Sequence, residues 1–136
     1  MAGRTYSGAL IAPDVNSATG FQGLPFMGNF NGNLHTIRNL RMVHDSLSPA
    51  ACFGLFGKID ATGGVLGLTL KDTAILGGTW TTYAGALAAY NSGVVNSCSA
   101  TGVITAGSGG KVGGLVGSDS GSTVNSQADV IIVRVS

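Results

Sequence analysis

The stretch VGGLVGSDSGSTVNS, residues 112–126, decides the fold because a second copy of it stands upstream. Residues 84–97 read AGALAAYNSGVVNS. Leu87 matches Leu115, and the closing Val-Asn-Ser matches once one residue is inserted after the glycine. A third, more diverged copy is FGLFGKIDATGGVLGL, residues 53–68. Because self-similarity at a fixed period indicates a repeat architecture, these copies outweigh any local pattern.

The copies recur at a nearly constant spacing. Leu55, Leu87 and Leu115 follow one another with a period of roughly 30 residues, which lies within the range of repeat architectures. No stretch shows the apolar spacing of an amphipathic helix. A period in this range without helices predicts one turn of a β-solenoid per repeat, with turns stacked about 4.7–4.9 Å apart.

Positions spaced by +3 and +5 predict three columns of stacked core side chains. The columns are Ile37-Val65-Val95-Val124, Leu40-Leu68-Cys98-Gln127 and Met42-Leu70-Ala100-Asp129. They begin with large apolar residues and end with polar ones. That drift is expected at the end of a solenoid, where the last turn has no neighbour to bury its face.

Short apolar runs between clusters of Gly, Ser and Asn predict strands joined by tight turns. We expect an opening strand over 4–12, a hairpin-like bend at 29–33, a strand over 36–42, and further strands near 53–57, 64–70, 73–76, 94–98, 102–105, 112–116, 122–126 and 129–135. The prediction is a single domain, 1–136: opening strand and loop at 1–25, a first clear turn at 26–52, and repeats at 53–83, 84–111 and 112–136.

Composition excludes several classes of protein. Only 10% of the 136 residues are charged and the net charge is +1, so nucleic-acid binding is not expected. Charged residues make up about 25% of an ordinary domain. No apolar run is long enough to span a membrane, and the N-terminus MAGRTYSGAL lacks the apolar core of a signal peptide.

Acidic residues are the main candidates for chemistry. Asp60 and Asp119 are expected in similar turns, with Asn91 between them, and such a row of oxygens would suit Ca²⁺. We favour the simpler interpretation that these side chains cap N–H groups of their own turns. His44-Asp45 lies near serines, but no nucleophile elbow is visible. HExxH and GxxxxGK[ST] are absent, so we assign no catalytic, cofactor-binding or metal-binding residue.

Three further features give no assigned site. Cys98 falls in a predicted core column, and both it and Cys52 are expected to be small buried residues. Trp80 is expected either to stack on a sugar or protein or to pack over a face. Thr69, Thr101 and Thr123 do not share one repeat position, which argues against the regular threonine rows of an ice-binding face.

The repeats resemble a known family. GLFG at 54–57, ALAA at 86–89 and GLVG at 114–117, each followed by a small-residue turn, are similar to GLUG-motif repeats. NSCSATGVI at 96–104 and FMGNFNGNLHTIRNL at 26–40 resemble other parts of the same repeat and its leader. The resemblance implies a right-handed parallel β-helix, here of about 4–5 turns, in adhesins similar to filamentous haemagglutinin and other bacterial or archaeal surface proteins.

Two functions remain open. The first is a non-enzymatic structural or adhesive module of an extracellular or cell-surface protein, which assembles end to end through its opening strand near Tyr6–Leu10 and its closing strand near Val130–Val135. A surface glycan or protein is a further possible partner. The alternative is a carbohydrate-active β-helix, a lyase or depolymerase fragment, with acids gathered in one groove. A repeat fragment without a function of its own is the weakest interpretation.

Overall fold

The computed structural model describes residues 5–13, 21, 23–43, 52–77, 83–107 and 110–135. Every regular element in this part of the chain is a β-strand. All the pairings between these strands are parallel. The all-β prediction is confirmed at this level.

The strands are short apart from a few long ones in one sheet. They are β1 (Asn29–Arg38), β2 (Arg41–Val43), β3 (Cys52–Phe53), β4 (Phe56–Ile59), β5 (Gly64–Leu76), β6 (Tyr83–Ala84), β7 (Ala88–Asn91), β8 (Val94–Asn96), β9 (Ser99–Gly107), β10 (Lys111–Val112), β11 (Val116–Asp119), β12 (Ser122–Val124) and β13 (Gln127–Val135).

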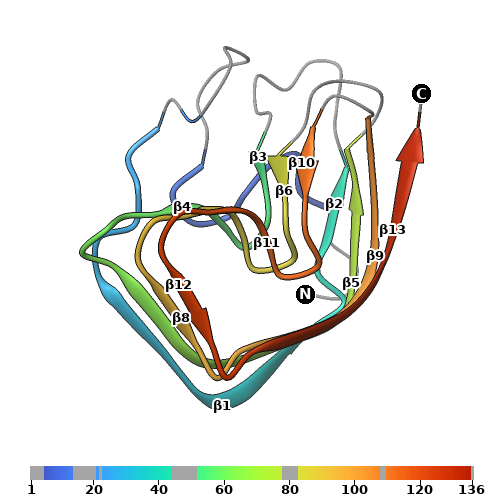
Figure 1. Cartoon of the computed structure of the whole chain (residues 1–136). Helices are drawn as coiled ribbons and strands as arrows, with labels where there is room; N and C mark the ends of the chain where they lie inside the picture. Colours follow the sequence, from blue (N-terminus) through green and yellow to red (C-terminus); the bar gives the residue numbers. More distant parts are fainter. Residues whose placement is uncertain are drawn as a thin grey trace.

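The strands form three parallel sheets that curl around a common interior (Figure 1). One sheet has the order β10-β6-β3, the second β11-β7-β4, and the third contains β12-β8-β5-β9-β13 with β1 and β2 paired to β5. The chain visits the sheets in the same order each time. We call one such visit to all three a circuit, and residues 110–135 the last circuit.

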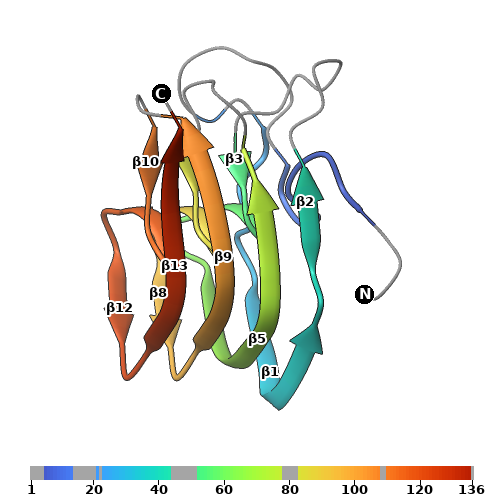
Figure 2. The same cartoon turned by 90° about the vertical axis from the view of Figure 1, so that its right-hand side faces the viewer.

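Successive circuits lie side by side (Figure 2). In the long sheet, β5 pairs with β9 and β9 with β13. Val65 is aligned with Val95, and Leu70 with Ala100, so these two parts of the predicted core columns are confirmed. Parallel pairing one repeat apart needs no hairpin, because each strand is reached only after the chain has visited the other sheets.

The predicted column positions in the last circuit are wrong by one residue. Val124 is aligned with Asn96, and Thr123 takes the place beside Val95. All strands of the last two circuits pair with one constant offset, which is the separation of Asp119 from Asn91. The repeated Val-Asn-Ser letters suggested an insertion, but the backbone has none.

The corner after these strands explains the mismatch. Ser97 and Asn125, which are separated by this same offset, both have left-handed backbones, with φ of 56° and 49°. The corner therefore recurs at the same place in each circuit although its residue differs. The same shift moves Gln127 from Cys98 to Ser99 and Asp129 from Ala100 to Thr101.

The first circuit also departs from prediction. Ile37 is aligned with Leu70 rather than Val65, and Met42 with Ile75. The expected bend at 29–33 lies inside β1, where the register shifts between Asn31 and His35. Asn33 and the following Leu34 have φ of 51° and 62°, so the Gly/Asn-rich segment forms a bulge within a strand instead of a hairpin.

The expected opening strand over 4–12 is reduced to isolated bridges. Tyr6 pairs with Met42 and Ile11 with Phe56, both in parallel. The Tyr6 N–H donates to the Arg41 carbonyl at 2.9 Å, and the Val43 N–H donates to the Tyr6 carbonyl at 2.8 Å. This segment therefore lies against the first circuits without forming a continuous strand.

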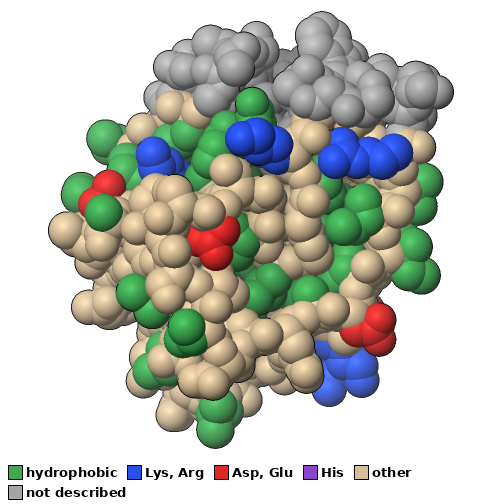
Figure 3. All heavy atoms as spheres, in the orientation of Figure 1, with side chains coloured by type: hydrophobic (Ala, Val, Ile, Leu, Met, Phe, Trp, Pro, Cys, Tyr) green, Lys and Arg blue, Asp and Glu red, His purple; other side chains and the backbone are tan. Residues whose placement is uncertain are grey.

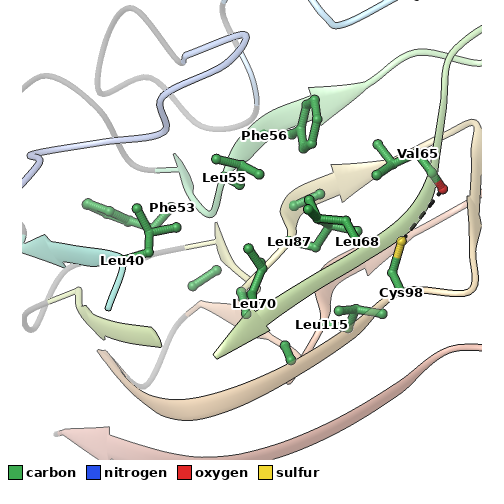
Figure 4. Close-up of a cluster of buried hydrophobic side chains, with 14 of the residues drawn as sticks. Leu40, Phe53, Leu55, Phe56, Val65, Leu68, Leu70, Leu87, Cys98 and Leu115 are labelled. Atoms are coloured by element: carbon green, nitrogen blue, oxygen red, sulfur yellow. Dashed lines mark hydrogen bonds between the residues drawn. The ribbon is translucent and has the colours of Figure 1, made fainter. Parts of the chain in front are cut away.

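The interior is packed with aliphatic and aromatic side chains from every circuit (Figure 4). Leu40, Phe53, Phe56, Leu70 and Leu87 are fully buried. Aromatic residues occupy the early circuits, where Phe30 meets Phe56 edge to face at 5.7 Å. The next circuit places Ala84 beside Phe53 and Ala88 beside Phe56, and the last circuit places Val112 and Val116 beside these alanines.

Candidate functional site

The last circuit forms an open edge along all three sheets. In the described structure, β10, β11, β12 and β13 each pair with a strand of the preceding circuit and with no other. β13 is nine residues long and aligned with β9 over its whole length without a register shift. Such an edge presents unpaired backbone N–H and C=O groups that can template another strand.

Alternation along β13 shows which of its backbone groups point away from β9, toward the open edge. The Gln127 N–H donates to the Cys98 carbonyl at 3.1 Å, so residue 127 points its backbone groups at β9. In a parallel pair this orientation alternates. Ala128, Val130 and Ile132 therefore direct their N–H and C=O groups toward the open side.

The same circuit exposes side chains that point inward in earlier circuits. Val95, Ala100 and Ile104 are buried, while their neighbours one circuit on, Thr123, Ala128 and Ile132, are exposed. Ile132 retains 40% of its accessible surface. Figure 3 looks onto this end face and shows hydrophobic side chains among backbone and polar atoms. We call this surface the end face.

A polar ladder borders the end face at the corner between β11 and β12. Asn91, which is only 1% exposed, donates its side-chain amide to the Asp119 carboxylate at 3.0 Å and to the Ser122 carbonyl at 3.3 Å. Its carbonyl oxygen accepts the Gly93 N–H at 3.0 Å. The ladder ties the last circuit to its predecessor through side chains as well as backbone.

Asp60 and Asp119 lie in similar turns, as predicted. Each accepts the N–H of the residue two positions on, Thr62 at 3.2 Å and Gly121 at 3.0 Å. The backbone N–H of Thr62 holds the pKa of Asp60 below its ordinary value of 3.8. The acids cap their own turns, which is the interpretation favoured from sequence. Asn91 is aligned with Ile59, not Asp60, so the three side chains do not form one straight row.

Arg134 occupies an inward-facing place at the end of β13 that sequence reasoning did not single out. It is aligned with the buried Ala106. Its guanidinium donates to the carbonyls of Gly107 at 2.8 Å and Gly110 at 2.9 Å. The alternation of DVIIVRV was the available signal, since it places Arg134 on the same face as Val130 and Ile132.

The cysteines are buried and are not joined in a disulfide. The Cys98 thiol lies 3.7 Å from the Val65 carbonyl oxygen, and burial raises the pKa of this thiol above its ordinary value of 9.0. The buried positions of Cys52 and Cys98 confirm the sequence-based interpretation.

Other sequence candidates are scattered or lie outside the described residues. His44, Asp45 and Trp80 are in the latter group. Thr69 is aligned with Ser99, Thr101 with Asp129 and Thr123 with Val95, so these threonines form no common row. Within the described ranges, no three His, Cys, Asp or Glu side chains are grouped closely enough to hold a metal ion.

No helix suited to crossing a bilayer occurs in the described part of the chain.

Comparison with known proteins finds a similarity to a very long archaeal protein. The chain is 31% identical over 117 residues to halomucin of Haloquadratum walsbyi (strain DSM 16790 / HBSQ001). The match covers 80% of this chain and 1% of halomucin. No family model matches, and no solved structure matches.

Proposed function

We propose that this chain is a non-enzymatic structural module of an extracellular or cell-surface protein. It is a right-handed parallel β-helix of the GLUG-repeat type whose ends serve for contact and continue the stack. The single observation that carries the proposal is the last circuit, which combines an unpaired parallel edge with exposed inward-facing positions.

The strand pairing supports a β-helix. Phe56 is aligned with Ala88, Val65 with Val95 and Asn91 with Asp119. Neighbouring circuits are therefore offset by roughly 30 residues, as expected when each repeat contributes one turn. This offset matches the spacing of the repeats that resemble GLUG motifs.

The similarity to halomucin supports a surface location. Its name describes a mucin, and mucins are extracellular proteins. The chain spans 1% of halomucin, a share suited to one module within a very long protein. Low charge and many short strands suit a module whose task is to present surface rather than to carry out a reaction.

The two exposed edges support end-to-end contact. β1 at the first circuit pairs only with β5 among the described strands, and β13 only with β9. Because all pairing is parallel, the last circuit of one copy presents a suitable edge for β1 of the next. The contact joins two different surfaces and does not close on itself, so repetition produces a filament or open oligomer. The segment Tyr6–Leu10, where sequence predicted a contact, lies at the same end of the molecule as β1, because Tyr6 forms a bridge with Met42 of the first circuit.

A matched pair of charge substitutions tests this contact. Ile132→Lys places a charge on the end face, whereas Val133→Lys places it one residue away on the outer face. The two side chains have similar exposure, 40% and 44%. An inward-pointing lysine on an edge strand blocks edge-to-edge pairing. Sedimentation velocity at high micromolar protein is expected to show assemblies for the wild type and for Val133→Lys, and a monomer for Ile132→Lys.

Thermal unfolding of both variants serves as the folding control. A wild type that remains a single monomer at this concentration, both in the centrifuge and by electron microscopy, would overturn the proposed assembly. Equal assembly by Ile132→Lys and the wild type would show that copies associate through another surface.

A further inference from the structure

We propose that the outer face of the long sheet carries a binding site for a neutral sugar ring, in a hollow between β1, β5 and β8. The hollow has a volume of about 350 Å³. It is lined by Asn29, Phe30, Asn31, Gly64, Val65, Leu66, Val94 and Asn96. It lies on the outer face and not on the end face, so this inference is independent of the proposed assembly.

The hollow exists because a glycine interrupts an outward-facing row. Asn29, Gly64 and Val94 are aligned across three circuits. A Cβ on Gly64 would lie 3.2 Å from the Asn29 side-chain oxygen and 3.4 Å from the Val94 carbonyl, so any larger side chain there fills the space. Asn31, Leu66 and Asn96 form the next outward-facing row. The site is therefore built only when the circuits stack.

The lining combines amides with apolar surface. Leu66 and Val94 are 44% and 47% exposed, so both contribute aliphatic surface to the hollow. The Asn31 oxygen accepts the Asn33 N–H at 2.8 Å, and the Asn96 oxygen accepts the Ser97 hydroxyl at 3.0 Å. Among the described residues, the amide nitrogens of Asn31 and Asn96 have no acceptor, and the Asn29 amide has no partner.

This lining selects a ligand class. No ionisable side chain lines the hollow, so it offers a charged ligand no ion pair. The unused amide nitrogens of Asn31 and Asn96 and the unpaired Asn29 amide favour hydroxyl groups, each of which both donates and accepts. The exposed aliphatic surface suits the C–H face of a pyranose ring. A volume of about 350 Å³ lies at the small end of ligand pockets, which suits one sugar residue.

The test is a titration of the ¹⁵N-labelled full chain followed by NMR at the side-chain amides of the three asparagines. The probes are the methyl glycosides of glucose, galactose and mannose, with glucuronic acid and cyclohexanol as comparison compounds. A ligand of about a dozen non-hydrogen atoms on an open site is expected to bind with a dissociation constant of about 1–10 mM. At least one neutral glycoside is expected to shift these resonances, and cyclohexanol and glucuronic acid are expected to bind more weakly.

Gly64→Val fills the hollow and is expected to weaken glycoside binding by at least about tenfold. Ala74→Val adds two of the three carbons that Gly64→Val adds, on the same face of β5 but outside the hollow, and is expected to bind as the wild type does. If Gly64→Val loses the dispersed spectrum of the folded chain, Asn29→Ala replaces it, with an expected loss of about fivefold because one hydrogen-bonding group is removed.

Three results would overturn the proposal: no shift with any neutral glycoside, equal binding by the folded variant and the wild type, or equal binding of cyclohexanol and the glycosides. None of these results bears on end-to-end assembly, which the centrifuge experiment tests separately.

Discussion

Asn91 and Asp119 lie in register in adjacent circuits, and the side-chain amide of Asn91 donates to the Asp119 carboxylate across 3.0 Å. The two residues lie at the corner between β11 and β12, where the last circuit enters the long sheet. Both also bond the N–H two residues on, in Gly93 and Gly121. The buried Asn91 amide and the exposed Asp119 carboxylate therefore each cap the N–H group of their own turn.

This relationship predicts unequal effects of two substitutions. Asn91→Ala removes the side chain that satisfies the Gly93 N–H and reaches the Ser122 carbonyl, and is expected to lower the free energy of unfolding by about 1–3 kcal/mol. Asp119→Asn keeps an acceptor for Asn91 and Gly121, and is expected to cost less than about 1 kcal/mol. Urea unfolding measures both. A larger loss for Asp119→Asn than for Asn91→Ala would contradict this account of the corner.

Gly102 is expected to be intolerant of any side chain. Its φ is 145°, and a Cβ there would lie 1.9 Å from the Thr73 carbonyl oxygen, a backbone atom of the neighbouring circuit. Gly102→Ala is therefore expected to destabilise the chain by about 2 kcal/mol or more. Gly64→Ala is the control, because its nearest neighbour is the flexible Asn29 side chain at 3.2 Å. Similar melting temperatures for the two variants would show that the close approach at Gly102 is not maintained in solution.

Cys98 gives a pH-dependent prediction. Burial raises the pKa of its thiol above 9.0, so the folded chain holds this proton more tightly than the unfolded chain does. The resulting stability is fully present below about pH 9 and is lost as the pH rises through the folded-state pKa. The free energy of unfolding, measured between pH 7 and pH 10, is expected to fall more for the wild type than for Cys98→Ala. Parallel pH profiles would contradict this assignment.

The sequence predicted the parallel stacking and its register in the middle circuits, but not the register of the first and last circuits. Equal spacing of leucines and valines was enough to place Val65 beside Val95, because both lie in copies of similar length. The prediction failed at Val124, because it aligned the two Val-Asn-Ser motifs with each other. The backbone instead keeps the same residue offset throughout the last two circuits, which places Val124 beside Asn96. Asn33 and Leu34 form a bulge. Composition cannot distinguish a bulge from a turn here, because bulges and turns can both contain residues with a left-handed backbone conformation.

The candidate sites were predictable to different degrees. The drift from apolar to polar columns did not identify the end face, because Gln127 and Asp129 are aligned with Ser99 and Thr101 and not with the buried Cys98 and Ala100. The exposed inward-facing positions are instead Thr123, Ala128 and Ile132. The hollow at Gly64 was not predictable, because it depends on which outward-facing residues of three circuits are aligned. That alignment depends in turn on the bulge in β1, which shifts the register between Asn31 and His35.

Disulfide trapping of the register tests the central claim most directly: the last two circuits lie in parallel with one constant offset, which aligns Val124 with Asn96. In a chain with Cys52 and Cys98 replaced by alanine, the pair Asn96→Cys and Val124→Cys joins aligned neighbours. The pair Val95→Cys and Val124→Cys joins residues whose side chains point to opposite faces. We predict rapid oxidation to an intramolecular disulfide for the first pair and little for the second, measured by mass spectrometry of the folded chain. Preferential cross-linking of the second pair, or of neither, would contradict the stacking on which both proposals depend.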